Sequence, residues 1–484
     1  MAVKSILNAL GKALYYSGTS THWFSASGLK SGSVLNGTTG NDSIYGDASV
    51  NVTMSGGAGD DIYYVYSSLN HVTEAAGGGI DTVNTWMSYT LPDNVENLVV
   101  TGNGSYAFGN NLDNIISGAS GSQIIDGGAG NDVLTGGGGA DTFIVSKGNG
   151  SDLITDFGSD DKVRLNQYGF TSFAQVLSHT TQQGADLRLS FGNGESLTFS
   201  NTTAANLQAG QFQLGLDRSQ LTQTFSDDFN TLSLHNSTTG TGTWDAKFPW
   251  APTQGGTLTG NNELQWYVNP AYAPTSSIKP FSDSNGVLTI TANKTPDALK
   301  SAAGGYSYTS GMLSSYSTFS QTYGYFEMRA DMPSEQGAWP AFWLLPESGA
   351  WPPELDVVEM VGQDPHTIQN TVHSDATGTH TKQGFNTEVA STDGYHTYGV
   401  LWKADTITWY FDDVAVAQAA TPADMHDPMY MLVDLAVGGI AGTPTDGLPN
   451  GSSMKIDYIK AYSLNDSPVG ASATTLATNS TTHT

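Results

Sequence analysis

The chain has 484 residues, enough for two to four domains at roughly 100–200 residues each, and contains no cysteine, which excludes a disulfide framework and a thiol nucleophile. Its 45 acidic and 17 basic side chains give a formal charge of -28, which disfavours nucleic acid and anionic membrane surfaces as partners and favours a divalent cation. No segment is long and apolar enough for membrane insertion. Gly11 and Lys12 interrupt the apolar positions near the start, so we expect no cleavable N-terminal signal peptide.

The composition changes near residue 220, and the upstream part, assigned to residues 1–216, is dense in Gly, Asn and Asp. It contains GGAGDD at 56–61, GGAGND at 127–132 and GGGGAD at 136–141, and the last two lie nine residues apart. Each unit combines a glycine-rich turn with an aspartate that can complete an oxygen cage around calcium, namely Asp61, Asp132 and Asp141. The apolar residues that follow, Tyr63, Leu134 and Phe143, are predicted to point into a small core.

These units resemble the repeats-in-toxin nonapeptides. Weaker copies occur at 37–46 and 109–118, whereas a single unit of this type could equally be a flexible linker. The resemblance implies a parallel β-roll with structural calcium and export through a type I secretion apparatus to the extracellular space. Residues 143–170 look like the capping sequence of such repeats, in which Asp156, Asp160 and Asp161 are interpreted as turn residues rather than calcium ligands.

Residues 217–465 are predicted to form an all-β domain. Short runs of alternating apolar and polar residues, such as VLTITA at 287–292 and TITWYFDD at 406–413, are separated by Gly, Pro, Asn and Asp. About 240 residues of antiparallel strand favour a two-sheet sandwich or jelly roll that can hold an extended ligand on one face. The Ser/Thr-rich tail at 466–484 is expected to be disordered and could carry an export signal.

The candidate chemistry lies in ELDVVE at 354–359. Side chains alternate along a regular strand, so Glu354 and Asp356 share a face, and one β-bulge at Val357 or Val358 would return Glu359 to it. Three neighbouring acids raise at least one pKa, so that one carboxylic acid stays protonated beside an ionised one, as glycosidases require. The alternative is the solvated face of an edge strand. Nearby indoles could belong to the core or stack on sugar rings, namely Trp339, Trp343 and Trp351.

At these residues the second half resembles family 16 of the glycoside hydrolases. Matching segments include FSDDFN at 225–230, NNELQWY at 261–267, GYFEMRADMP at 324–333, WPAFWLLP at 339–346, ELDVVE at 354–359 and VHS at 372–374. The resemblance implies Glu354 as nucleophile, Glu359 as general acid/base and Asp356 as the residue that holds the nucleophile. It further implies that Asn261, Glu263 and His373 line the substrate site and that Asp457 is a structural calcium ligand. Asp434 departs from the Asn that relatives often carry.

The resemblance also sets the expected reaction. It implies a retaining endo-β-glucanase of the laminarinase-like branch, which cleaves β-1,3 or mixed β-1,3/1,4 linkages. The order of modules resembles secreted endo-1,3-1,4-β-glycanases that trim succinoglycan-type exopolysaccharide. Laminarin-type β-1,3-glucan is the alternative substrate, and a calcium-stabilised polysaccharide-binding matrix protein or adhesin is the alternative function. A zinc protease with an HExxH motif is excluded, because no such motif occurs.

Overall fold

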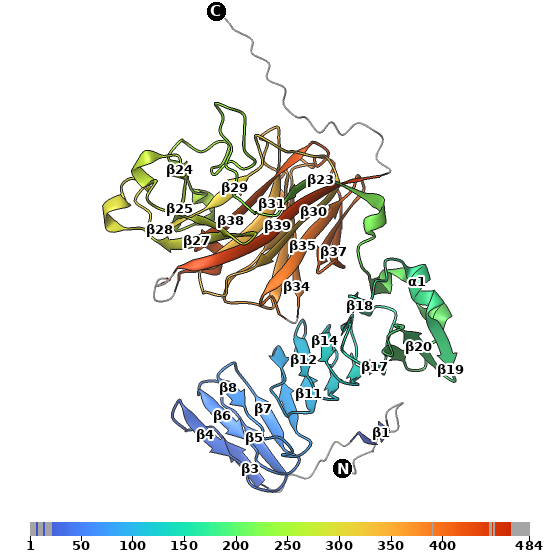
Figure 1. Cartoon of the computed structure of the whole chain (residues 1–484). Helices are drawn as coiled ribbons and strands as arrows, with labels where there is room; N and C mark the ends of the chain where they lie inside the picture. Colours follow the sequence, from blue (N-terminus) through green and yellow to red (C-terminus); the bar gives the residue numbers. More distant parts are fainter. Residues whose placement is uncertain are drawn as a thin grey trace, which may run out of the picture. The chain divides into compact units, whose positions relative to one another are not determined.

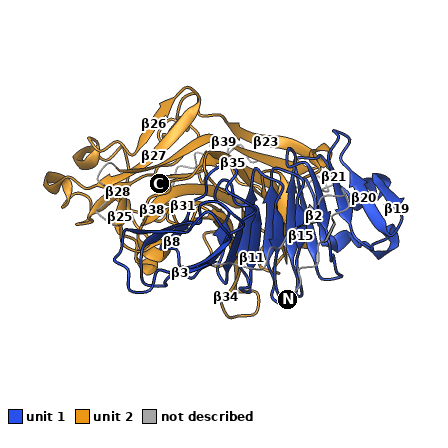
Figure 2. Ribbon diagram, turned by 90° about the horizontal axis from the view of Figure 1, so that it is seen from below, with its two compact units in different colours: residues 1–215 blue, residues 216–484 orange. Residues whose placement is uncertain are grey.

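The computed structural model describes residues 22–389, 391–444, 448 and 451–465, together with the backbone of β1 (Ile6–Leu7) and β2 (Ala13–Leu14). The chain divides into two compact units, Met1–Gly215 and Leu216–Thr484 (Figure 2). Within the described residues, no helix has the length and apolar character needed to cross a membrane. The predicted disordered tail at 466–484 lies outside the described residues, as do most of the first twenty residues, on which the signal-peptide prediction depends.

Unit 1 is a parallel β-roll, as predicted, whose successive strands between residues 22 and 166 alternate between two sides (Figure 1). The three strands at 180–199 then extend one side and pair antiparallel with each other. One side is a sheet of β19 (Thr180–Gln183), β20 (Asp186–Ser190), β21 (Ser196–Phe199), β17 (Ser151–Ile154), β15 (Val133–Thr135), β13 (Ile115–Ser117), β11 (Asn97–Val100), β9 (Thr82–Thr85), β7 (Ile62–Val65), β5 (Asp42–Tyr45) and β3 (His22–Ser25). The other side has β4 (Ser33–Asn36), β6 (Val52–Ser55) and β8 (Asn70–Val72), and separately β10 (Tyr89–Thr90), β12 (Tyr106–Asn110), β14 (Ile124–Gly128), β16 (Thr142–Ser146), β18 (Lys162–Asn166) and β22 (Phe212–Gln213). A short helix, α1 (Phe173–Ser178), precedes β19.

The nine-residue period explains this architecture. Tyr106 pairs with Ile124, and Ile124 pairs with Thr142, so one turn of the roll takes eighteen residues, or two nonapeptides. Each nonapeptide contributes one short strand and one glycine-rich turn. The apolar residue that follows each turn points inward, and Tyr63, Leu134 and Phe143 are fully buried in a continuous core, as predicted.

Unit 2 is a sandwich of two sheets. The larger has β24 (Gly255–Gly256), β25 (Gln265–Val268), β28 (Tyr308–Ser310), β27 (Val287–Lys294), β39 (Ser452–Leu464), β30 (Gly324–Asp331), β35 (Tyr395–Trp402), β36 (Thr406–Phe411) and β37 (Val414–Ala420), with β23 (Leu221–Asp227) paired to β39 and β26 (Phe281–Ser284) to β27. The smaller has β29 (Met312–Ser314), β38 (Met429–Val437), β31 (Ala338–Pro346), β32 (Glu354–Glu359), β33 (Thr367–Ser374) and β34 (Thr381–Glu388). All pairings are antiparallel except that of β25 with β28.

Both faces of the smaller sheet carry apolar side chains, and this determines where the site can lie. Alternate residues of β31, such as Phe342 and Leu344, pack between the two sheets. The residues between them point to the opposite face, where Trp343 packs in a second cluster with Phe248 and Tyr267. The second cluster covers β31 and β38, so the polar side chains of β32 mark the part of this outer face that remains for a substrate.

Candidate active site

The acidic strand β32 contains the predicted β-bulge. Phe342 lies opposite Val358 and the next residue, Trp343, lies opposite Asp356, so Val357 is the extra residue. Val357 and Val358 are both buried between the sheets. Glu359 therefore returns to the face that bears Glu354 and Asp356, which confirms the bulge prediction.

Two buried side chains that the sequence analysis missed hold the backbone at this bulge. A bulge interrupts the ladder and leaves carbonyl groups to be satisfied elsewhere. The Asn370 side-chain amide donates to the carbonyl of Val357 at 2.7 Å, and the Trp409 indole donates to the carbonyl of Asp356 at 2.8 Å. Asn370 is on β33 and Trp409 comes from the opposite sheet, so both sheets determine the spacing of the acids.

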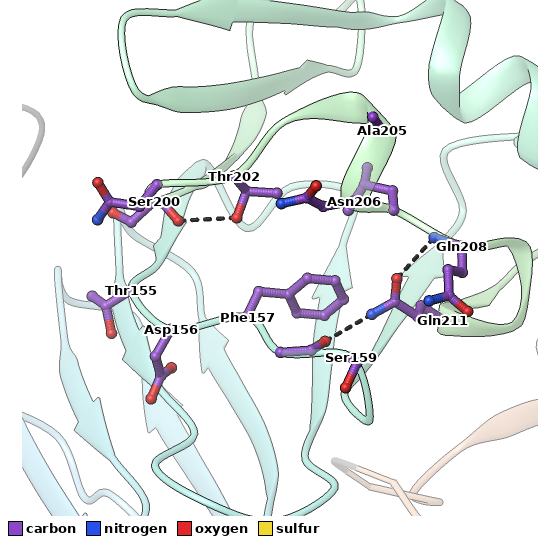
Figure 3. A pocket seen from close by; sticks show the side chains of 13 residues that line it. Thr155, Asp156, Phe157, Ser159, Ser200, Thr202, Ala205, Asn206, Gln208 and Gln211 are labelled. Atoms are coloured by element: carbon purple, nitrogen blue, oxygen red, sulfur yellow. Dashed lines mark hydrogen bonds between the residues drawn. The ribbon is translucent and has the colours of Figure 1, made fainter.

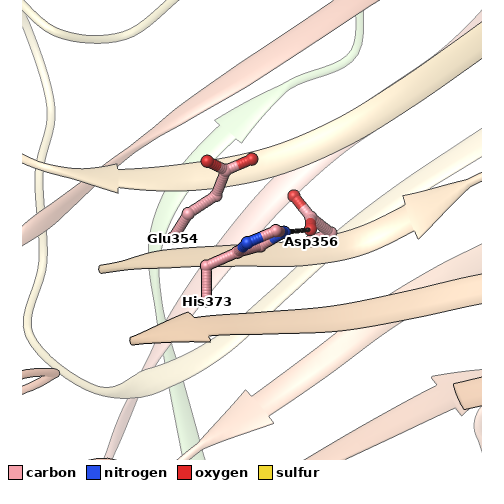
Figure 4. A group of neighbouring side chains, drawn as sticks. All are labelled: Glu354, Asp356 and His373. Carbon is pink, nitrogen blue, oxygen red and sulfur yellow. Dashed lines mark ion pairs between the residues drawn. The ribbon is translucent and has the colours of Figure 1, made fainter. Parts of the chain in front are cut away.

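Each acid has a partner on the outer face of the sheet. The Trp351 indole donates to Glu354, and the Trp339 indole donates to Glu359 at 3.1 Å. His373 lies opposite Glu354 on β33, with its Nε2 3.5 Å from Asp356 Oδ2 (Figure 4). One ligand atom each of Glu354, Asp356 and His373 lies within 4.8 Å of the other two.

Burial and mutual repulsion keep protons on this group of acids. Burial, followed by the charge of Asp356, raises the pKa of Glu354 to about 8. Burial also raises the pKa of Asp356 well above its usual range and raises that of Glu359, although the nearby charge of Lys382 opposes both changes. Three neighbouring carboxyl groups with raised pKa values titrate as one coupled group, so a protonated acid and an ionised carboxylate can coexist on this face.

The predicted calcium residues, Asp61, Asp132 and Asp141, occupy equivalent positions in their repeat units. Asp61, Asp132 and Asp141 are each 1% exposed, and one oxygen of each accepts a backbone N–H of the preceding turn at 2.7–2.8 Å. The second oxygen of Asp61 and of Asp132 has no hydrogen-bond partner among the described residues. A Cβ on the first glycine of each unit would lie about 1.9–2.3 Å from the aspartate oxygen, so glycine is required there: Gly56, Gly127 and Gly136. A buried carboxylate oxygen without a donor fits a calcium cage.

Further acids continue this arrangement. The sequence analysis did not assign Asp81 and Asp152, and it interpreted Asp161 as a turn residue. Asp81, Asp152 and Asp161 accept the backbone N–H groups of Asp61, Asp132 and Asp141 at 2.8–3.0 Å. Glu74 lies with Asp61 and Asp81 in a group whose ligand atoms are all within 4.8 Å. Asp81, Asp152 and Asp161 are each the sixth residue of a hexapeptide that contains glycine, such as AGGGID at 76–81. This pattern could have identified them from the sequence.

The comparisons with known proteins agree with both modules. The family model for glycosyl hydrolases family 16 matches residues 268–460, and that for the RTX calcium-binding nonapeptide repeat matches 31–63, 108–143 and 117–152. Endo-1,3-1,4-beta-glycanases ExsH and EglC of Rhizobium meliloti (strain 1021) are 66% and 63% identical over 461 residues, which is 95% of this chain and 98% of each relative. The chain belongs to glycoside hydrolase family 16. A solved structure of SCLam, a non-specific endo-β-1,3(4)-glucanase of this family, is 28% identical with a TM-score of 0.44 and covers 52% of this chain and 95% of its own.

The three tryptophans predicted to contact the substrate differ in exposure. Trp351 is 59% exposed, whereas Trp339 and Trp343 are 8% and 6% exposed. The Trp343 indole donates to Asp434 at 2.8 Å, and the Tyr267 hydroxyl donates to the other oxygen of Asp434 at 2.6 Å. Asp434 therefore fixes two aromatic side chains. Sugar stacking by the three indoles stays a prediction, for which Trp351 offers the accessible ring.

Two other predicted substrate residues, Asn261 and Glu263, lie on a segment that precedes β25. Glu263 is 6% exposed and accepts hydrogen bonds from Asn261 at 3.2 Å and from Gln265 at 2.7 Å, as well as from the backbone of Leu258. Asn261 itself is exposed. Glu263 thus organises the segment, and Asn261 remains accessible to a ligand. Their assignment to the substrate site stays a prediction.

Asp457 on β39 forms an ion pair with Arg329, with Nη1 and Oδ2 2.6 Å apart. The guanidinium of Arg329 also lies over the ring of Tyr395. This internal cation competes with a metal ion for the carboxylate of Asp457. The calcium assignment of Asp457 stays a prediction.

The pocket drawn in Figure 3 lies in unit 1 and has a volume of about 570 Å³. It is lined by residues 155–159, 200–202, 205–208 and 211, among which Asp156 is the one ionisable side chain. Asp156 accepts the backbone N–H groups of Gly136 and Gly137 at 3.0 and 2.8 Å. The pocket offers no pair of acids, so the acidic strand β32 remains the candidate catalytic site.

The hydrogen bond from Asn370 to the β-bulge gives a first testable prediction. Asn370→Leu should destabilise the fold by about 1–3 kcal/mol, because the buried carbonyl of Val357 loses its donor. It should also lower kcat more than it raises KM, because Glu359 loses its alignment with Glu354. Denaturant unfolding and steady-state kinetics measure the two effects. Asn386→Leu, at an exposed position on β34, is the matched control. Equal kinetics in both variants would contradict a role for Asn370 in alignment.

Proposed function

We propose that this protein is a secreted endo-β-1,3-1,4-glycanase that hydrolyses internal bonds of a succinoglycan-like exopolysaccharide. The bulged strand with three acids on one face carries the proposal, because it supplies an acid and a nucleophile side by side. Two Rhizobium meliloti relatives named endo-1,3-1,4-beta-glycanase support the linkage type, since each aligns over almost its whole length.

The proposed mechanism is a retaining double displacement. Glu354 attacks the anomeric carbon while Glu359 gives its proton to the leaving oxygen, and a glycosyl ester forms on Glu354. Glu359, now ionised, then takes a proton from water, which attacks the ester and releases the sugar. Asp356 lies two residues from Glu354 on the same face of β32 and is proposed to orient it. The indoles of Trp351 and Trp339 hold the two glutamates, and the exposed ring of Trp351 is proposed to stack on a sugar.

Calcium is proposed to be structural and to act in the N-terminal module. The buried aspartates of the roll repel one another without a cation, so the roll would stay unfolded in a calcium-poor cytoplasm. Outside the cell, calcium would complete the cages and drive folding. This supports passage through a type I secretion apparatus before folding, with residues 1–216 as the calcium module and 217–465 as the catalytic domain.

The substrate assignment is tested by reducing-sugar release from succinoglycan, laminarin and barley β-glucan with calcium present. We expect kcat/KM to be highest on succinoglycan, with internal cleavage visible as a rapid fall in polymer length. Equal or faster cleavage of laminarin would instead assign a β-1,3-glucanase. Binding without cleavage of any polymer, by protein with native circular dichroism, would contradict the enzyme assignment and favour a polysaccharide-binding matrix protein.

A further inference from the structure

The face of the sheet that bears the acids of β32 also has the side chains of a transition-metal site. Glu354, Asp356 and His373 each offer a ligand atom, and these atoms all lie within 4.8 Å of one another. Glu354 and Asp356 are two residues apart on β32, and His373 lies opposite Glu354 on β33. Their carboxyl groups and the imidazole point to a common side of the sheet (Figure 4).

The position of the Asp356 carboxylate is the second observation that points to a ligand. Asp356 is 3% exposed, and its Oδ2 has no hydrogen-bond partner in the part of the chain that the structure describes. This oxygen is 3.5 Å from His373 Nε2. Two ligand atoms bound to a tetrahedral zinc at about 2.0–2.2 Å lie about 3.4 Å apart. A zinc ion therefore fits between these two atoms without a large movement.

A second histidine supports metal binding by the first. His380 Nε2 lies 2.9 Å from His373 Nδ1, and the two rings are stacked. A neutral His373 that binds a metal through Nε2 carries its proton on Nδ1, which can then donate to His380. Metal-binding histidines commonly donate their second N–H in this way, which fixes the tautomer and the ring orientation.

We propose that Glu354, Asp356 and His373 bind zinc or a similar borderline divalent cation, and that this cation inhibits the enzyme by competing with the substrate for Glu354. A ligand set that contains an imidazole favours such ions over calcium, which prefers oxygen ligands alone. The protein would then respond to two metals in opposite ways, with calcium stabilising the roll and zinc blocking the acids.

The test uses the full chain with saturating calcium and zinc chloride as the probe. We expect calorimetry without substrate to find one zinc ion bound per chain in the micromolar range, and kinetics to find competitive inhibition. His373→Asn should weaken zinc binding at least tenfold, and His380→Ala about tenfold. His396→Gln is the matched control, because His396 pairs with Asp412 at 2.7 Å on the other sheet, and it should leave binding unchanged.

Binding of cobalt(II) gives a readout that does not depend on activity, because its absorption spectrum reports nitrogen ligation and tetrahedral geometry. A cobalt spectrum that is lost in His373→Asn would support the site. Zinc binding that is equal in wild type and His373→Asn, inhibition that is not competitive, or equal inhibition by additional calcium would overturn the proposal. None of these results would affect the glycanase assignment, which is measured by cleavage in metal-buffered solution.

Discussion

Glu359→Gln is expected to lower polysaccharide cleavage about a thousandfold while largely sparing substrates whose leaving group needs no proton. General acid catalysis contributes roughly 10²–10⁴ in rate, and glutamine cannot supply the proton. The amide oxygen of glutamine can still accept the Trp339 N–H, so the local structure should persist. The measurement compares kcat/KM on polysaccharide with that on a dinitrophenyl oligosaccharide. Added azide should accelerate turnover of the latter and give a glycosyl azide with retained configuration.

Glu354→Gln is expected to behave differently, because it removes the nucleophile. Activity on both kinds of substrate should then fall about equally. Azide should not restore a turnover that retains the anomeric configuration. Glu347→Gln, at an exposed position just after β31, is the control and should keep wild-type kinetics. If Glu359→Gln lost activity on both substrates alike and azide had no effect, the assignment of Glu359 as the acid/base would be wrong.

The face of each acid could be predicted from the sequence because the side-chain period of a strand is two. Glu354 and Glu359 are five residues apart, so they share a face only if one residue is inserted, and Val357 is that residue. The groups that hold the bulge could not be found in this way. Asn370 and Trp409 lie 13 and 53 residues from the carbonyls they bind, and no local pattern reports such contacts.

The exposure of the tryptophans also required the structure. Trp339, Trp343 and Trp351 have the same local context of apolar and proline residues, yet the first two are buried beneath a second cluster that includes Phe248 and Tyr267. That cluster comes from a segment some seventy to a hundred residues upstream. Burial on both faces of β31 removes the alternation that would have separated core from surface.

In the roll, the buried aspartates of the regular repeats could be predicted from the sequence, whereas those of the irregular repeats were missed. Asp132 and Asp141 follow two intact glycine-rich units, and their equivalence is visible in the nine-residue spacing. Asp81 follows a longer turn, since Ile62 pairs with Thr82 twenty residues on rather than eighteen. Hydrogen bonding between turns tolerates this extra length, because each carboxylate needs only the backbone N–H of the turn before it.

Removal of calcium is expected to lower the melting temperature of the roll while the family 16 domain keeps its own unfolding transition. Each site that is saturated a hundredfold above its Kd contributes about 2.7 kcal/mol to the free energy of unfolding. Asp132→Asn should therefore lower the calcium-loaded melting temperature of the roll by about 5–10 °C. Without calcium the same change should stabilise the roll, because it removes a buried carboxyl group that must take up a proton on folding. Calorimetry of the full chain, with and without chelator, measures both effects, and Asp160→Asn, at an exposed position, is the control.

The way in which the stability of the roll changes with pH provides an independent test of these aspartates. Burial, followed by the charge of Asp152, raises the pKa of Asp132 to about 9, and burial raises those of Asp61 and Asp81 to about 7 and 8. In the unfolded chain these groups titrate near 3.8, so the calcium-free folded state binds more protons between those values. The calcium-free roll should be most stable below about pH 4 and lose stability up to about pH 9. The stabilisation by calcium should accordingly be larger at pH 8 than at pH 5, because calcium replaces the lost protons. A melting temperature of the calcium-free roll that rises with pH across this window would contradict the role of these aspartates.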